Sequence, residues 1–252
     1  MDKVRITGQV LDGAIREVGF VVRRDGHDVP AVLWRPEAAR PAVVLLGHGG
    51  SGHKRIERHV RLARWFAARA GIACLAIDGP FHGDRSVDGD APLDYQRRIA
   101  QVGARSVHQS MRDDSLAALA VADQLDWVDE QRVAFLGMSM GARYGLPVCS
   151  ALGTRLKCAV LGKFGLTQSD DLPETLAAND MITHAAANIH APVLQHVQWH
   201  DELFPHDGQF ELFDLFASTE KVLRARPGDH ALTRLDDEIA WREYVGANLE
   251  SN

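Results

Sequence analysis

The stretch Gly137-Met138-Ser139-Met140-Gly141 decides the fold of this chain, because it places a serine between two glycines directly after an apolar run at residues 133–136. This Gly-x-Ser-x-Gly pattern predicts a nucleophile elbow, a sharp turn from a strand into a helix. The glycines remove Cβ atoms that would clash in the crowded turn. We expect Ser139 at the carboxyl end of the strand, facing the amino end of a helix at about residues 142–152, whose partial positive charge favours an oxyanion.

Length and composition are those of a globular α/β protein. The chain has 252 residues, of which 46% are hydrophobic and 25% are charged, and both values are ordinary for a folded domain. Its net charge of -6 argues against a nucleic-acid partner, which would need clustered lysine and arginine. The densest basic run, at residues 54–69, is interpreted as the solvated face of a helix.

The cysteines and the amino terminus indicate a cytoplasmic protein. Cys74, Cys149 and Cys158 lie in apolar segments and cannot all pair, so we expect buried thiols in a reducing compartment. Residues 1–10 are polar and charged, without the apolar core of a signal peptide, and no apolar run is long enough to span a bilayer. We therefore expect no membrane partner, whereas the oligomeric state is not indicated by the sequence.

Strands and helices alternate along the chain. Residues 17–22 and 29–34 predict a hairpin that turns at Arg24-Asp25-Gly26 and forms an antiparallel edge of the sheet. Further strands are expected at 42–46, 72–77, 133–136, 156–161, 192–199 and 222–225, with helices at 54–70, 111–125, 142–152, 172–187, 208–217 and 236–249. This alternation predicts a single α/β domain over residues 1–252, with a mostly parallel sheet and helices on both faces.

Residues 84–109 differ in composition from the segments around them. They contain several aspartates and arginines and few large apolar residues, although Tyr95, Ile99 and Val102 are spaced for one weakly amphipathic helix. The segment is either a small cap insertion over the site or a plain solvated connection.

A glycine-rich loop, Gly47-His48-Gly49-Gly50-Ser51-Gly52, follows the strand at 42–46. Its glycines let backbone N–H groups approach a ligand closely, as an oxyanion hole requires. A Walker lysine pattern is absent, since Gly52 is followed by His53, which disfavours a phosphate site of that kind. His48 and His82 are expected to hydrogen-bond the backbone and hold loops. A metal site built from His48, His53, His82 or His200 is not expected, because their spacings are not those that metals favour.

Two loops after later strands supply partners for Ser139. A serine hydroxyl needs a base, and the base needs an orienting carboxylate. Asp201 follows the strand at 192–199, and His230 follows the last strand in a glycine-containing turn, so we predict Ser139, Asp201 and His230 as a catalytic triad. The acid has competitors in the chain, namely Glu202, Asp207, Asp170 and Asp171.

Taken together, the chain order Ser–Asp–His, the His-Gly-Gly-Ser-Gly loop and the Gly-Met-Ser-Met-Gly elbow resemble the α/β-hydrolase superfamily. The Trp-His-Asp-Glu-Leu-Phe-Pro segment at 199–205 and Gly228-Asp229-His230 are similar to the dienelactone hydrolase and small carboxylesterase branch. The resemblance covers residues 29–244 and implies an eight-stranded sheet whose second strand is antiparallel. It also implies an oxyanion hole made by the N–H groups of Gly50 and Met140. Dienelactone hydrolases proper carry a cysteine nucleophile, so serine at the elbow argues against dienelactone itself as substrate.

The sequence thus predicts a serine hydrolase that cleaves short-chain carboxylic esters, lactones or thioesters through an acyl-enzyme and needs no cofactor. A serine peptidase and a non-catalytic binding module of the same fold are the alternatives. Haloalkane dehalogenases and epoxide hydrolases are disfavoured, because they need an aspartate at the elbow. The residues that either line the substrate pocket or pack in the core are Met138, Met140, Lys163, Phe164 and Trp199.

Overall fold

The computed structural model describes residues 3–87, 91 and 93–250. The strands are β1 (Lys3–Asp12), β2 (Ile15–Arg24), β3 (His27–Pro36), β4 (Val43–Gly47), β5 (Ala73–Ile77), β6 (Val133–Met138), β7 (Leu156–Gly162), β8 (Val193–Gln198) and β9 (Lys221–Arg226). The α-helices are α1 (Glu57–Trp65), α2 (Asp94–Val102), α3 (Ala104–Gln124), α4 (Met140–Leu152), α5 (Asn179–Ala186), α6 (His206–Leu215) and α7 (Leu235–Glu250).

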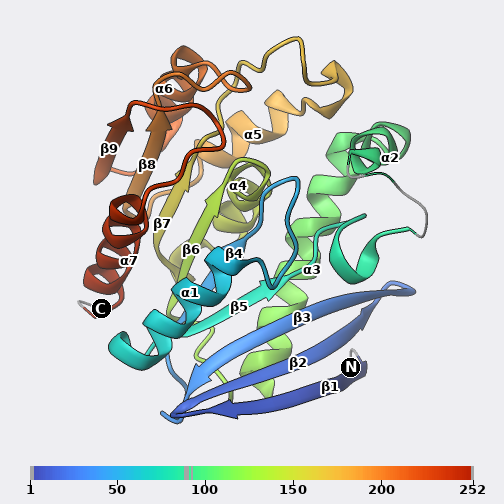
Figure 1. The fold of residues 1–252 in the computed structure, drawn as a ribbon, viewed down its shortest axis with the longest axis vertical. Coiled ribbons are helices and arrows are strands. Elements are labelled where there is room, and N and C mark those ends of the chain that lie inside the picture. The colour runs from blue at the N-terminus through green and yellow to red at the C-terminus, as the bar shows by residue number, and fades with distance from the viewer. Residues whose placement is uncertain (1–2, 88–90, 92, 251–252) are drawn as a thin grey trace.

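Within the described residues the strands form one nine-stranded sheet in the order β1-β2-β3-β5-β4-β6-β7-β8-β9. The first three strands are antiparallel, and the strands from β5 to β9 run parallel (Figure 1). This confirms the predicted mostly parallel sheet. Because β4 and β6 are neighbours, the loops that follow these two strands meet at one edge of the sheet.

The sheet has one strand more than the eight that the family resemblance implies. β1 pairs with β2 along almost its whole length, so β1 forms the edge of the sheet and the hairpin of β2 and β3 does not. Residues 4–12 are all exposed, although Val4, Ile6 and Val10 alternate with polar residues, which is a strand signal that the sequence analysis did not use. The hairpin itself turns as predicted, with positive φ angles of 44° at Asp25 and 84° at Gly26.

Apolar side chains fill both faces of the sheet. One core lies between the sheet and helices α3, α4 and α5, and it includes Leu119, Leu146 and Ile182. The other lies between the opposite face and helices α1 and α7, and it includes Leu62 and Trp241. The sheet is therefore covered on both faces, as predicted, and Cys74, Cys149 and Cys158 are free and buried within these layers.

The predicted helix at 54–70 begins later, at Glu57, and ends as a short π-helical turn at Phe66–Ala70. Gly71 then caps it in the left-handed conformation with φ 65°, as the sequence predicts. The expected helix at 172–187 is also shorter, because α5 covers only Asn179–Ala186.

The segment at 84–109 forms the helix α2 and the start of α3, which begins at Ala104 instead of the expected residue 111. Residues 88–90 and 92 of this segment lie outside the described residues. Leu93 and Tyr95 reach the cavity described below, so this part of the segment covers the site. Among the helices described, none is long and apolar enough to cross a membrane.

Candidate active site

Ser139 occupies a strained turn between β6 and α4. Its φ of 59° and ψ of -127° lie outside the regions that residues with a side chain normally adopt. The neighbouring glycines make the turn possible. A Cβ on Gly141 would lie 2.3 Å from the carbonyl oxygen of Gly47, and one on Gly137 would lie 2.6 Å from the carbonyl oxygen of Gly141. The predicted sharp strand-to-helix turn is confirmed.

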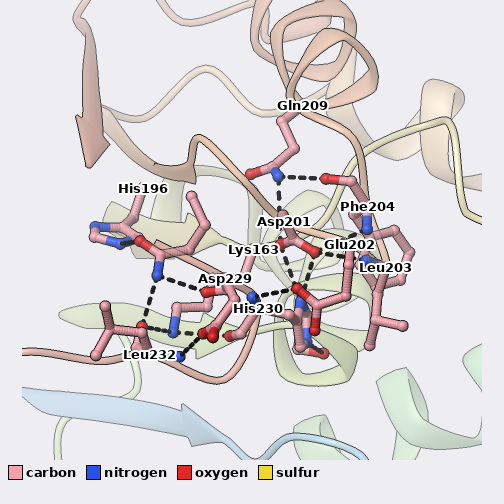
Figure 2. Close-up of polar contacts among 12 residues, drawn as sticks. Lys163, His196, Asp201, Glu202, Leu203, Phe204, Gln209, Asp229, His230 and Leu232 are labelled. Carbon is pink, nitrogen blue, oxygen red and sulfur yellow. Dashed lines mark hydrogen bonds and ion pairs between the residues drawn. The ribbon is translucent and has the colours of Figure 1, made fainter. Parts of the chain in front are cut away.

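The structure brings the three predicted residues into one chain of contacts. The Nε2 atom of His230 lies 2.8 Å from the Oγ atom of Ser139, and its Nδ1 atom lies 2.9 Å from each carboxylate oxygen of Asp201. The Asp201–His230 contact is drawn in Figure 2. Ser139 follows β6, Asp201 follows β8 and His230 follows β9. A hydroxyl, an imidazole and a carboxylate in this order can generate a serine nucleophile.

Asp201 is buried and its orientation is fixed by other hydrogen bonds. Its Oδ1 atom accepts the backbone N–H groups of Leu203 at 3.0 Å and Phe204 at 2.8 Å, and the side chain of Gln209 approaches Oδ2 at 3.5 Å. These bonds hold the carboxylate edge toward the His230 ring.

The competing carboxylates lie elsewhere. Glu202 accepts the backbone N–H of His230 at 2.8 Å and so contacts the loop instead of the ring. The Asp207 side chain is 84% exposed and contacts His206. Asp170 and Asp171 are both exposed. Among the described acidic residues, Asp201 is the one whose carboxylate contacts the ring of His230.

Gly50 and Met140, the predicted oxyanion-hole residues, both line the cavity that contains Ser139. Met140 is the first residue of α4, where a backbone N–H has no partner within the helix. No hydrogen-bond acceptor for either N–H group is found within the described part of the chain. Two N–H groups without a backbone acceptor, on residues that line the same cavity as Ser139, are the kind of donors that a tetrahedral oxyanion needs.

His48 and His82 hold the surrounding loops, as predicted. His48 accepts the N–H of Gly79 at its Nε2 atom, at 2.9 Å. The ring nitrogens of His82 lie 2.8 Å from the carbonyl oxygens of Pro80 and Gly50. Burial lowers the pKa of His48 to about 4, so this ring stays neutral near pH 7.

A cavity of about 380 Å³ opens beside Ser139 and is lined by loops from both halves of the chain. Its cationic residues are Arg58, Arg143 and Lys163, and none of the described lining residues is an aspartate or glutamate. The guanidinium of Arg143 is buried, donates one hydrogen bond to the carbonyl oxygen of Leu176, and leaves its Nε atom without a partner. Burial lowers the pKa of this guanidinium from its usual value.

Two of the predicted pocket residues lie away from the cavity lining. Met138, Met140 and Lys163 line it, whereas Phe164 is buried against Phe204 in the core. Trp199 is 44% exposed, and its ring stacks on His206 with centroids 4.5 Å apart. Trp199 is not among the described residues that line this cavity, because its side chain packs on His206 and Phe210 of α6.

Arg143 and Tyr95 are pocket residues that the sequence analysis did not assign. Arg143 lies four positions after Ser139 at the start of α4, and residues at this spacing share one face of a helix. A lone arginine in an otherwise apolar helix could therefore have indicated it. No comparable signal exists for Tyr95, whose hydroxyl would lie 2.2 Å from a Cβ placed on Gly50, because this contact joins distant parts of the chain.

The fold and this arrangement define an α/β hydrolase, and comparison with known proteins identifies its family. Residues 29–234 match the dienelactone hydrolase family, and the chain belongs to that family of hydrolases. Esterase FrsA of Salmonella typhi is 31% identical over 158 residues, which are 61% of this chain and 33% of FrsA. The quorum-quenching protein AidA of Acinetobacter baumannii is 31% identical over 166 residues, which are 64% of this chain and 48% of AidA. The chain thus spans one third to one half of these curated relatives.

Solved structures agree with this assignment. A cold-adapted esterase from an Arctic intertidal metagenomic library is 29% identical, with a TM-score of 0.82 over 96% of this chain and 97% of the esterase. A dienelactone hydrolase from Anabaena variabilis has a TM-score of 0.69 at 16% identity, over 94% of this chain and 98% of that protein. The second likeness concerns the fold alone.

Proposed function

We propose that this protein is a serine esterase that hydrolyses short-chain carboxylic esters through an acyl-enzyme on Ser139. The observation that carries the proposal is the continuous series of contacts from Ser139 Oγ through the His230 ring to the Asp201 carboxylate, at 2.8 Å and 2.9 Å. Membership in a hydrolase family and similarity to an esterase structure support it.

In the proposed reaction, His230 takes the proton of the Ser139 hydroxyl as the oxygen attacks the acyl carbon. Asp201 holds the imidazole in the tautomer with the proton on Nδ1 and stabilises the imidazolium that forms. The N–H groups of Gly50 and Met140 bind the tetrahedral oxyanion, and each such donor is typically worth about 3 kcal/mol. His230 then protonates the leaving alcohol and activates water for hydrolysis of the acyl-enzyme.

The size of the cavity supports a short acyl group. At about 380 Å³ it lies at the small end of the range for small-molecule pockets, and a long lipid chain would extend beyond it. Lactones and thioesters expose the same type of acyl carbon and are further candidate substrates.

A comparison of p-nitrophenyl acetate with p-nitrophenyl palmitate tests the proposal. We expect the acetate to be hydrolysed with the higher kcat/KM, and we expect Ser139→Ala to remove this activity. Ser150→Ala, at the other end of α4, is the matched control and should keep it. Equal or reversed rates would contradict the short-chain specificity. Cleavage of peptide p-nitroanilides in place of the esters would favour a serine peptidase, and no turnover of any acyl substrate would favour a binding module.

A further inference from the structure

Lys163 is a buried lysine whose ammonium group donates all of its hydrogen bonds to one short segment. It directly follows β7 and is 3% exposed, with a left-handed φ of 51°. Its Nζ atom donates to the carbonyl oxygens of His230 at 3.2 Å and Leu232 at 2.5 Å, and to the hydroxyl of Thr233 at 2.8 Å. An ammonium has three N–H donors, so all of them bind residues 230–233 and none is left for a substrate.

The segment that Lys163 holds is the one that carries the imidazole. Figure 2 shows Lys163 next to His230, Leu232 and Asp229. Gln198 donates to the carbonyl oxygens of Asp229 at 2.8 Å and Leu232 at 2.7 Å. The segment joins the end of β9 to the start of α7 without regular secondary structure of its own. The carbonyl groups of Asp229, His230 and Leu232 therefore take their hydrogen bonds from these two side chains.

A charged lysine at this position is energetically costly. Burial first, and the nearby Arg58 guanidinium second, lower the pKa of Lys163 from its usual 10.5 to about 8. Within the described residues no carboxylate forms an ion pair with its ammonium. The titratable groups that act on it from the surrounding elements are Arg58, His196, Asp201, Asp229 and Asp237. Burying a cation against neutral carbonyl groups costs free energy of folding. A role for the geometry that the cation imposes would explain why such a residue stands here.

We propose that Lys163 is a positioning residue for His230, and that its protonated ammonium holds residues 230–233 so that the imidazole stays between Ser139 and Asp201. The inference rests on the proposed esterase function. A neutral amine has only two N–H donors, so deprotonation leaves one of the three acceptors without its partner. The segment then relaxes, and the 2.8 Å contact between His230 and Ser139 lengthens. Lys163 thereby makes the activity dependent on pH on the alkaline side.

Removal of the ammonium tests the positioning role. In Lys163→Met, which keeps the length of the side chain but none of its donors, we expect kcat for p-nitrophenyl acetate to fall about 10²-fold, since a misplaced catalytic group can cost that much. We expect KM to change much less, because the three N–H donors of Nζ already bind residues 230–233. Lys157→Met is the matched control, since Lys157 lies on β7, the strand that Lys163 follows, and among the described residues its Nζ donates to the Thr154 carbonyl oxygen at the surface.

The pH profile separates positioning from a purely structural role. For the wild type we expect kcat to fall as pH rises through about 8. In Lys163→Arg, whose guanidinium stays protonated, we expect part of the activity of the wild type and no fall up to pH 10. Because the pKa in the folded state lies below the unfolded value, the unfolded chain binds the extra proton above pH 8. This group therefore makes the fold more stable as pH rises, and the loss of activity should precede any loss of thermal stability.

Three results would overturn the inference: a wild-type kcat that stays level from pH 7 to 10, a parallel fall in the wild type and in Lys163→Arg, or full kcat in folded Lys163→Met. If Lys163→Met does not fold, the dependence of kcat on pH in the wild type and in Lys163→Arg tests the inference instead. A wild type that hydrolyses no ester contradicts the proposed function, which distinguishes that failure from the failure of this inference.

Discussion

Asp201 contacts His230 through both of its carboxylate oxygens, each 2.9 Å from the Nδ1 atom of the ring. The same carboxylate accepts two backbone N–H groups from residues 203 and 204. The carboxylate is therefore fixed by its own loop, and the imidazole is held against it. This contact determines which tautomer of His230 faces Ser139.

Replacing this carboxylate should nearly abolish catalysis without unfolding the protein. In Asp201→Asn we expect kcat to fall by about 10⁴-fold, because an amide favours the wrong imidazole tautomer. Asp207→Asn is the matched control, since the Asp207 side chain is 84% exposed at the start of α6, and it should retain wild-type kcat. Initial rates with p-nitrophenyl acetate measure both variants. Equal losses in the two variants would contradict the role of Asp201.

Gly50→Ala should disturb the oxyanion site through Tyr95. The added methyl group would lie 2.2 Å from the Tyr95 hydroxyl, so the Tyr95 side chain, the loop or α2 must move. We expect kcat to fall about 10²-fold, the typical effect of losing one oxyanion donor. The double variant Gly50→Ala/Tyr95→Ala removes the clash and should recover part of the loss relative to Gly50→Ala alone. Unchanged kcat in Gly50→Ala would show that the added methyl group does not displace this part of the site, and would contradict the prediction.

The charges around the cavity predict a preference for anionic esters. Arg143 has a buried, incompletely paired guanidinium, and the described lining contains no carboxylate. A charge-assisted hydrogen bond contributes about 1.5 kcal/mol or more, so a p-nitrophenyl ester with a free carboxylate should have about a tenfold higher kcat/KM than its methyl-capped counterpart. Arg143→Met should remove this preference. Arg105→Met, which changes an exposed ion pair with Asp180, should keep it. A preference for the neutral ester would contradict the prediction.

Acid should destabilise the fold through histidines that are buried in the neutral form. Burial lowers the pKa of His59 and of His108 to about 3, below their usual value of 6.5. The unfolded chain therefore binds a proton at each histidine between pH 6.5 and 3 while the folded chain does not, and stability falls as pH falls through this range. Each histidine contributes a slope of up to about 1.4 kcal/mol per pH unit.

Urea unfolding at pH 7, 6 and 5 measures this dependence. His108→Phe keeps an aromatic ring beside Tyr144, which the His108 ring contacts edge to face, and should reduce the slope by up to one proton. His184→Asn, at an exposed position on α5, should leave the slope unchanged. An equal slope in the wild type and in His108→Phe would contradict the assignment.

The sequence predicts the central elements because their signals are local. The glycines around Ser139 and the apolar runs before the site loops fix the turn and the parallel strands. β1 also carries a local signal that the sequence analysis did not use, because Val4, Ile6 and Val10 alternate with polar residues, although residues 4–12 are exposed on both faces. The positions of Ser139, Asp201 and His230 follow from the carboxyl ends of β6, β8 and β9.

Contacts between distant parts of the chain are the features that the sequence does not predict. The hydrogen bonds from Lys163 to residues 230–233 and the approach of Tyr95 to Gly50 depend on how loops fold back over the sheet. Trp199 is a further example. Its position directly after β8 does not reveal that its ring packs on His206.

The proposed nucleophile is tested most directly by mass spectrometry of the protein after reaction with a fluorophosphonate probe. The account predicts one adduct per chain, mapped to Ser139, that is absent in Ser139→Ala and present in Ser150→Ala. Labelling should also slow strongly in His230→Ala, because the imidazole activates the hydroxyl. No adduct, or an adduct on a residue other than Ser139, would contradict the central claim.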